Sequence, residues 1–141
     1  EIIFRRYETR VIAEMGGIRS QTPKFTSMFL ILVMASISLP STFNFVGEFT
    51  VLYSLSQINI WFAILGGTTI ILGAYYMLRM FQHAMLGETN SKLFADVSIN
   101  EGITLVAIIV VLLFFGLYPK PIIDLITPSL EEILNQINRI N

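Results

Sequence analysis

Between Lys24 and Arg79 the sequence contains 54 residues, and Glu48 is the only one of them that is formally charged. A helix needs roughly 20 predominantly apolar residues to cross the hydrocarbon core of a bilayer. The window is therefore long enough for two crossings, which we predict at residues 27–55 and 60–81. This feature favours an integral membrane protein over a water-soluble domain.

The overall composition agrees with a membrane setting and excludes several classes of function. Apolar residues make up 54% and charged residues 13% of the 141 positions, whereas a soluble domain carries about 25% charged residues. The net charge of −1 gives no basic excess for binding nucleic acid. The sequence has no cysteine and one histidine, so we expect no metal, iron–sulfur cluster or other cofactor in this chain.

The first predicted span is about 29 residues, which is longer than a bilayer requires. Pro40 lies inside it, lacks a backbone N–H and disfavours helical geometry at Leu39. We therefore predict a broken helix, which is tolerated at membrane depth only where protein or a water-filled cavity surrounds it. The hydroxyl groups expected to cap the second half or to satisfy freed backbone groups are those of Ser36, Ser38, Ser41 and Thr42.

A third span is predicted at residues 99–118, where Ser98 and Glu101 have the spacing of a capping box. The fold class is thus all-α and integral to the membrane, with three transmembrane helices, the first of them broken near Pro40. The three spans together occupy residues 27–118.

The remaining residues, 119–141, are predicted to form a short amphipathic helix at the membrane interface. Thr127 is its expected N-cap and Pro128 its first helical residue. The expected apolar face holds Leu130, Ile133, Leu134 and Ile137, and the expected polar face holds Glu131, Glu132 and Arg139.

Residues 1–26 are predicted to be the end of a preceding helix, which stops at Gly16–Gly17, followed by a loop on the cytoplasmic or matrix side. The chain lacks an initiator Met, so we expect it to be part of a longer protein. Lys and Arg concentrate in this segment and after the second span, whereas the turn at residues 56–59 has none. By the positive-inside rule the basic segments face the cytoplasm or matrix. These basic residues are Arg5, Arg6, Arg10, Arg19, Lys24, Arg79 and Lys92.

Glu48 is the residue most expected to carry chemistry. A carboxylate at the centre of a span costs roughly 2.5 to 3.5 kcal/mol on insertion scales, so such residues usually face a bundle interior or a water path. Asn44 lies one helical turn earlier on the same face and is a possible hydrogen-bond partner. Proton transfer is the favoured hypothesis; the alternative is a structural ion pair with a basic residue outside this chain.

Arg79 and His83 lie one turn apart at the end of the second span. One interpretation is a proton uptake point. The other, which the position favours, is a pair of side chains that reach the membrane interface and anchor the helix there.

The segment Leu39-Pro40-Ser41-Thr42-Phe43-Asn44-Phe45-Val46-Gly47-Glu48-Phe49 resembles the LPxTxNFxGEF segment of antiporter-like subunit 4, the M chain, of respiratory complex I. Further similarities extend the resemblance from about Tyr7 to about Pro121. They are Thr9-Arg10 followed by Gly16-Gly17-Ile18, the run from Ile71 to Met80, and Gly116-Leu117-Tyr118-Pro119.

The resemblance implies the end of helix 11 and helices 12 to 14 of a 14-helix proton-pumping subunit, with helix 12 discontinuous. Glu48 would be the last protein carboxyl on the proton's exit route. The subunit would hold no redox centre, while FMN, iron–sulfur clusters and quinone would bind in partner subunits. Its surroundings would be the lipid bilayer and other membrane subunits, especially neighbouring antiporter-like ones, in a bacterial inner membrane or alternatively the mitochondrial inner membrane.

Two other functions remain open on the sequence alone. The first is the large subunit of a multi-subunit cation/proton antiporter, which belongs to the same superfamily. The second is a purely structural membrane module, in which Glu48 holds a bundle together.

Overall fold

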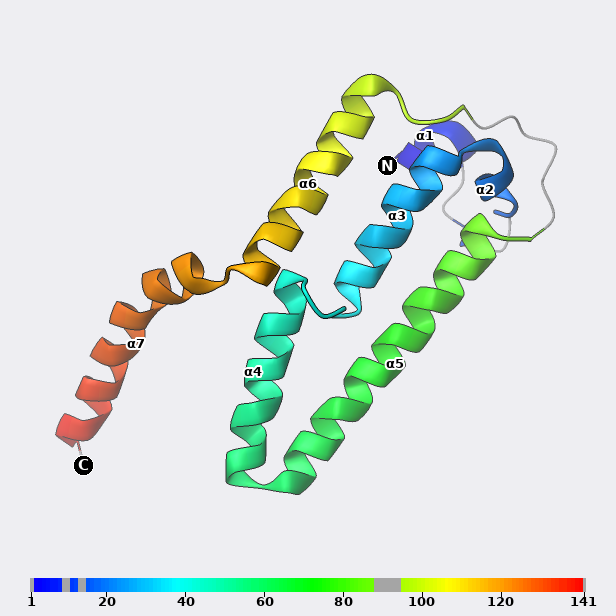
Figure 1. Ribbon diagram of the computed structural model, residues 1–141. Coiled ribbons are helices and arrows are strands. Elements are labelled where there is room, and N and C mark those ends of the chain that lie inside the picture. Colours follow the sequence, from blue (N-terminus) through cyan, green and yellow to red (C-terminus); the bar gives the residue numbers. More distant parts are fainter. Residues whose placement is uncertain (1, 9–10, 13–14, 88–94, 141) are drawn as a thin grey trace.

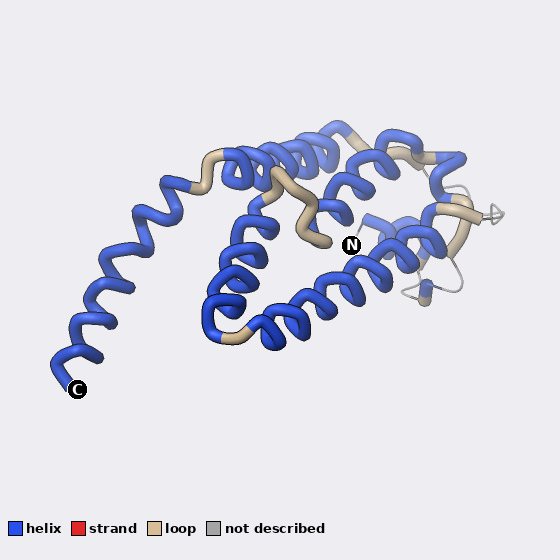
Figure 2. Tube along the Cα trace, turned by 60° about the horizontal axis from the view of Figure 1, so that its bottom comes forward, coloured by secondary structure: helices blue, strands red, loops and turns tan. Residues whose placement is uncertain are grey.

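The computed structural model describes residues 2–8, 11–12, 15–87 and 95–140. This described part folds into helices connected by short loops and contains no strand (Figures 1 and 2). The helices are α1 (Ile2–Tyr7), α2 (Ile18–Gln21), α3 (Pro23–Ser36), α4 (Phe43–Ile58), α5 (Ile60–Met85), α6 (Ile99–Leu117) and α7 (Lys120–Ile140).

Two of these helices, α5 and α6, are long and apolar enough to cross a membrane, and α3 is a shorter apolar helix. Few residues of these two helices are buried: in the most apolar 18-residue stretch of each helix, 0% of the residues are buried in α5 and 6% in α6. A water-soluble protein would bury such faces in its core. The predicted all-α membrane fold is therefore confirmed, and the predicted first span consists of α3 and α4.

The break in the first span lies where Pro40 predicted it, and it covers residues 37–42. The backbone N–H of Ser38 donates to Ala35 O at 3.3 Å, and that of Leu39 donates to Met34 O at 3.2 Å. Ser38 has a φ of 59°. These bonds and the left-handed residue form a Schellman motif, with serine at the position that glycine usually occupies. The helix thus ends before Pro40 rather than at it.

The predicted capping of α4 by a hydroxyl group is wrong, whereas Ser36 does bond to a backbone carbonyl as predicted. Thr42 is the N-cap of α4, but its hydroxyl donates to Leu39 O at 2.7 Å instead of accepting from α4. Ser36 Oγ donates to Val33 O at 2.8 Å within α3. Ser38 Oγ is buried and has no hydrogen-bond partner among the described residues. Ser41 has a φ of 81°.

The helices α4 and α5 run antiparallel, side by side, and α6 packs beside α3 and the start of α4 (Figure 1). Asn59 joins α4 to α5, and its side-chain oxygen caps α5 by accepting from the N–H of Trp61 at 2.9 Å. The buried core lies where α2, α3 and the end of α5 meet. Its members are Ile18, Phe25, Val33, Phe81, Ala84 and Met85. Because this core buries the last turn of α5, the helix continues past the predicted end at residue 81.

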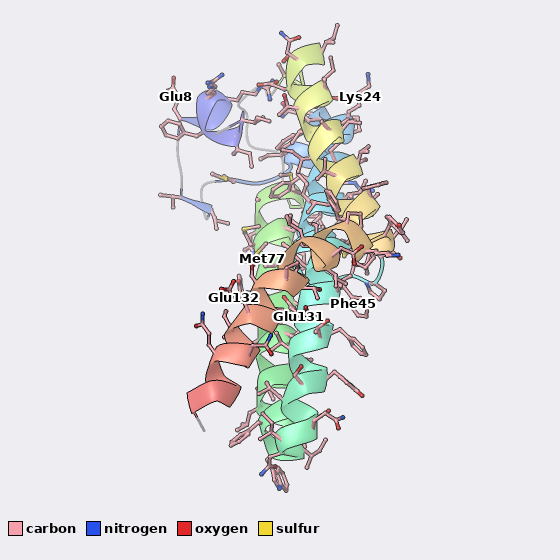
Figure 3. The ribbon with its side chains drawn as sticks, turned by 90° about the vertical axis from the view of Figure 1, so that its left-hand side faces the viewer. Glu8, Lys24, Phe45, Met77, Glu131 and Glu132 are labelled. Carbon is pink, nitrogen blue, oxygen red and sulfur yellow. The ribbon has the colours of Figure 1, made fainter. Side chains whose placement is uncertain are left out.

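Side chains from three distant segments join at the same end of the molecule. Arg6 donates to the Glu101 carboxylate at 2.7 Å and to Asp96 O at 3.2 Å. Asp96 Oδ1 accepts from the N–H of Phe25 at 3.1 Å, in the first turn of α3. Lys24, beside Phe25, lies at this end in Figure 3. Arg10 and Lys92, which were also predicted to face the cytoplasm or matrix, lie outside the described residues.

The capping box at the start of α6 is confirmed: Ser98 and Glu101 each accept from the other's backbone N–H.

The predicted N-terminal helix is too long, because α1 ends at Tyr7 and Glu8 takes a φ of 56°, which a continuing helix does not allow.

The predicted start of the C-terminal helix at Thr127 and Pro128 is wrong. The N–H groups of Ile122 and Ile123 already donate to Pro119 O, so α7 begins at Lys120 and continues through Pro128. Thr127 Oγ1 donates to Ile123 O at 2.8 Å instead of capping.

This helix projects away from the other described helices (Figures 1 and 2). Described side chains on both of its faces are exposed. Leu130 and Ile133 are each 53% exposed, and Glu131 and Glu132 are exposed as well. The side chains of Leu134, Ile137 and Arg139 lie outside the part that the structure describes.

Candidate functional site

A hollow of about 730 Å³ lies between α4 and α5 and extends to the break; we call it the α4–α5 hollow. Asn44, Gly47 and Glu48 lie on its α4 wall, and Thr69 and Tyr76 lie on its α5 wall. Ser36, the last residue of α3, also lines it, together with apolar residues such as Ile37 and Met77. The break thus places the end of α3, the first turns of α4 and the middle of α5 around one space.

Glu48 lies in the second turn of α4, half-buried, and lines the hollow. Asn44 lines the same wall, because residues four apart share a face of a helix. The sequence prediction that these two side chains share one polar surface is therefore consistent with the structure. No hydrogen bond between them is recorded among the described residues.

Two of the hydroxyl groups around the hollow donate to their own helices. Ser36 donates to Val33 O, and Thr69 Oγ1 donates to Gly66 O at 2.7 Å. Their oxygen atoms still have lone pairs that accept further hydrogen bonds. The hollow therefore combines one carboxyl, one amide and several hydroxyl oxygens, a set that can bind water molecules next to Glu48.

The end of the hollow that lies toward the α4–α5 turn is apolar. Leu52 and Leu55 line it on α4, and Gly66 faces them on α5. A Cβ atom at Gly66 would lie 3.0 Å from a terminal carbon of Leu52, so the absence of a side chain lets the two helices approach closely.

Arg79 and His83 are separated from this hollow. Neither residue lines it, although Met77, two residues before Arg79, does. Arg79 donates to the hydroxyl of Tyr75 at 2.6 Å, and His83 Nδ1 lies 2.8 Å from Arg79 O. Both side chains are exposed on α5. The structure therefore brings Glu48 and Asn44 together but does not place Arg79 or His83 with them.

Sequence reasoning did not connect Thr69 and Tyr76 with Glu48. Helical spacing relates residues within one helix, whereas these two side chains reach the hollow only because α5 packs antiparallel to α4. The signal in the sequence was weak: Thr69 is a hydroxyl residue near the middle of an apolar span.

The described residues give no sign of a metal site, since no three His, Asp or Glu side chains among them converge. Among the described residues that line the hollow, none is basic. No described residue of the lining itself therefore supplies a cation to pair with Glu48.

Comparisons with known proteins point to one family. A family model described as NADH:quinone oxidoreductase/Mrp antiporter, TM, matches residues 1–73. NADH-quinone oxidoreductase subunit M of Rickettsia typhi is 36% identical over 135 residues, which are 94% of this chain and 27% of that protein. Subunit M of Mycobacterium tuberculosis is 34% identical over 140 residues, which are 97% of this chain and 25% of that protein.

A solved structure is similar as well. A chain of the respiratory complex I from Thermus thermophilus with bound NADH matches with a TM-score of 0.76 and 27% sequence identity, over 83% of this chain and 25% of that one. This chain spans about a quarter of the length of the relatives it matches. Because the family model covers more than half of the chain, the chain belongs to the NADH:quinone oxidoreductase/Mrp antiporter transmembrane family, and it is homologous to subunit M.

Proposed function

We propose that this chain is part of a proton-translocating, antiporter-like membrane subunit of NADH:quinone oxidoreductase. Glu48 takes up a proton from a hydrated region inside the membrane and releases it toward the outer side. Electron transfer from NADH to quinone takes place in other subunits and drives this step at a distance. The similarity to subunit M of several bacteria supports the proposal.

The observation that carries the proposal is the place of Glu48. It is the only formally charged residue between Lys24 and Arg79, and it lies on the wall of a hollow that also holds amide and hydroxyl groups. An ionisable residue inside a membrane is costly unless it faces a protein interior or water. A carboxyl in such a place can accept and release protons without a metal or cofactor of its own.

The same proposal also implies which molecules surround the chain and in which membrane it lies. Its neighbours are lipid and other membrane subunits of the complex, especially antiporter-like ones. FMN, iron–sulfur clusters and quinone belong to partner subunits rather than to this chain. The bacterial relatives support a bacterial inner membrane as its location.

The direct test replaces Glu48 by Gln in the full-length subunit within the intact complex. Glutamine keeps the size and hydrogen-bonding capacity of the side chain but cannot exchange a proton at this site. NADH-driven proton pumping in membrane vesicles should fall by about 10²-fold or more, since about 10²-fold is the lower end of the effect of a lost acid–base group. The amount of assembled complex, measured on a native gel, should stay unchanged.

Two outcomes would contradict the proposal. Pumping at the wild-type rate would exclude Glu48 from proton transfer. Poor assembly with normal pumping per assembled complex would indicate that Glu48 is a structural ion-pair residue.

Co-purification also separates the proposal from a cation/proton antiporter, which the family description includes. Complex I would bring subunits that contain flavin and iron–sulfur clusters, whereas an antiporter would bring only membrane subunits.

A further inference from the structure

The helix α6 contacts the broken span at one glycine, Gly116. A Cβ atom added there would lie 2.6 Å from the Cα of Thr42 and 2.5 Å from its carbonyl carbon, and it would also clash with the carbonyl oxygen of Ser41. Cβ atoms essentially never come closer than 3.0 Å to another heavy atom. These obstacles are backbone atoms, which cannot rotate away as a side chain can. Only glycine allows α6 to lie this close to the break.

The segment that Gly116 contacts is held in a strained conformation. Ser38 and Ser41 have positive φ values of 59° and 81°, and neither is glycine. Residues in such conformations cost of order 1–3 kcal/mol each and persist only where the surrounding structure fixes them. Thr42, next to Ser41, is only 2% exposed. The contact with α6 is thus part of what fixes the break.

The residue before Gly116 extends the contact to the start of α4. The rings of Phe115 and Phe43 meet edge to face with centroids 6.2 Å apart. Phe43 is the first residue of α4, and Glu48 follows less than two turns later in the same helix. Because a helix moves as a stiff unit, a shift at Phe43 carries Glu48 with it.

From these contacts we infer that Gly116 is a positioning residue for proton transfer: it sets where α4 begins and hence where the Glu48 carboxyl lies in the α4–α5 hollow. Gly116 does not line the hollow and acts only through the break. This inference rests on the proposed role of Glu48.

The test introduces Gly116→Ala into the full-length subunit of the intact complex. Restoring ordinary van der Waals contact at Thr42 requires a displacement of about 1 Å. A misplacement of this size can lower a rate about 10²-fold. We therefore expect at least about tenfold slower pumping per assembled complex. Electron transfer from NADH to an artificial acceptor, which takes place in other subunits, should be unchanged.

Gly102→Ala is the matched control, because Gly102 is in the same helix and a Cβ atom there would meet no atom of the described residues within 4 Å. It should pump like the wild type. If Gly116→Ala prevents assembly, Phe115→Leu becomes the deciding variant, since it removes the ring contact with Phe43 without adding bulk. It should pump about two- to tenfold more slowly per assembled complex, in keeping with about 0.5–1.5 kcal/mol for one aromatic pair.

The inference is overturned if Gly116→Ala assembles and pumps like Gly102→Ala, or if Phe115→Leu pumps normally where Gly116→Ala does not assemble. Glu48→Gln, measured in parallel, separates this failure from failure of the proposed function. If Glu48→Gln stops pumping while the Gly116 and Phe115 variants pump normally, only the positioning role of Gly116 is rejected. Normal pumping in Glu48→Gln rejects proton transfer by Glu48 itself.

Discussion

At the scale of single residues, the α4–α5 hollow combines one group that exchanges protons with several that only bind water. Glu48 is the carboxyl, and Thr69 on the opposite wall offers a hydroxyl oxygen whose hydrogen already points to Gly66 O. A proton approaching Glu48 through water needs such acceptors to hold the water molecules in line. The contribution of Thr69 can be separated from that of Glu48 because threonine has a close isostere.

Replacing Thr69 by Val keeps the shape of the side chain and removes the hydroxyl oxygen. We expect proton pumping to slow by about two- to tenfold, which corresponds to one hydrogen bond of about 0.5–1.5 kcal/mol. Thr68→Val is the matched control, because Thr68 Oγ1 also donates to a carbonyl in its own helix, that of Leu65, yet it does not line the hollow. Equal pumping by the two variants, measured in vesicles, would show that the Thr69 hydroxyl is not used.

The polar α4 wall of the site was predictable from the sequence, whereas the opposite wall was not. The spacing of Asn44 and Glu48 places both on one face of α4, whatever the rest of the molecule does. The placing of Thr69 and Tyr76 depends on how α5 packs on α4, and the contact of Gly116 depends on how α6 packs on the break. These contacts are between different helices, and the residue spacing within one helix does not predict them.

At the scale of elements, the break shows how a local rule can give the right place and the wrong details. Pro40 correctly predicts that the first span is interrupted, but α3 has already ended at Ser36 through its own Schellman motif. The motif is hard to recognise in the sequence because its left-handed residue is serine, whereas glycine is the usual residue at this position. The cost of serine at this position can be measured.

Ser38→Gly should stabilise the subunit by about 1 kcal/mol, because glycine adopts positive φ without the cost of roughly 1–2 kcal/mol that a Cβ atom brings. The change also removes a buried hydroxyl that has no partner among the described residues. The measurement is the temperature at which the purified complex loses this subunit.

Ser36→Gly is the control for Ser38→Gly, since Ser36 lies in the last turn of α3 with ordinary helical geometry. It should destabilise the subunit by up to about 1 kcal/mol. A lower dissociation temperature for Ser38→Gly would mean that the Ser38 hydroxyl forms a hydrogen bond in the full-length protein that outweighs the backbone strain.

At the scale of the whole molecule, the described helices are held together differently at their two ends. At one end, α4 and α5 are joined by a tight turn at Asn59 that the sequence predicts from its polar residues. At the other end, Arg6, Glu101 and Asp96 connect segments more than 70 residues apart. The sequence predicted the basic character of that end from the positive-inside rule, but it could not show which charges pair.

Asp96 is the residue of this network whose role is easiest to isolate. Its Oδ1 atom accepts from the N–H of Phe25, one of the orphan donors in the first turn of α3, and from the N–H of Val97. It therefore caps α3 from a segment 71 residues away. Because α3 leads directly into the break, loosening its first turn should reduce the stability of the whole bundle.

Asp96→Ala should destabilise the subunit by about 1–2 kcal/mol, the usual cost of a lost cap. Asp96→Asn keeps an oxygen that can accept from the same N–H groups, so it should recover most of that loss. Thermal dissociation of the intact complex, followed on native gels, measures both variants. If Asp96→Asn is as unstable as Asp96→Ala, the negative charge of Asp96 matters more than its hydrogen bonds, and the cap is not what holds α3 in place.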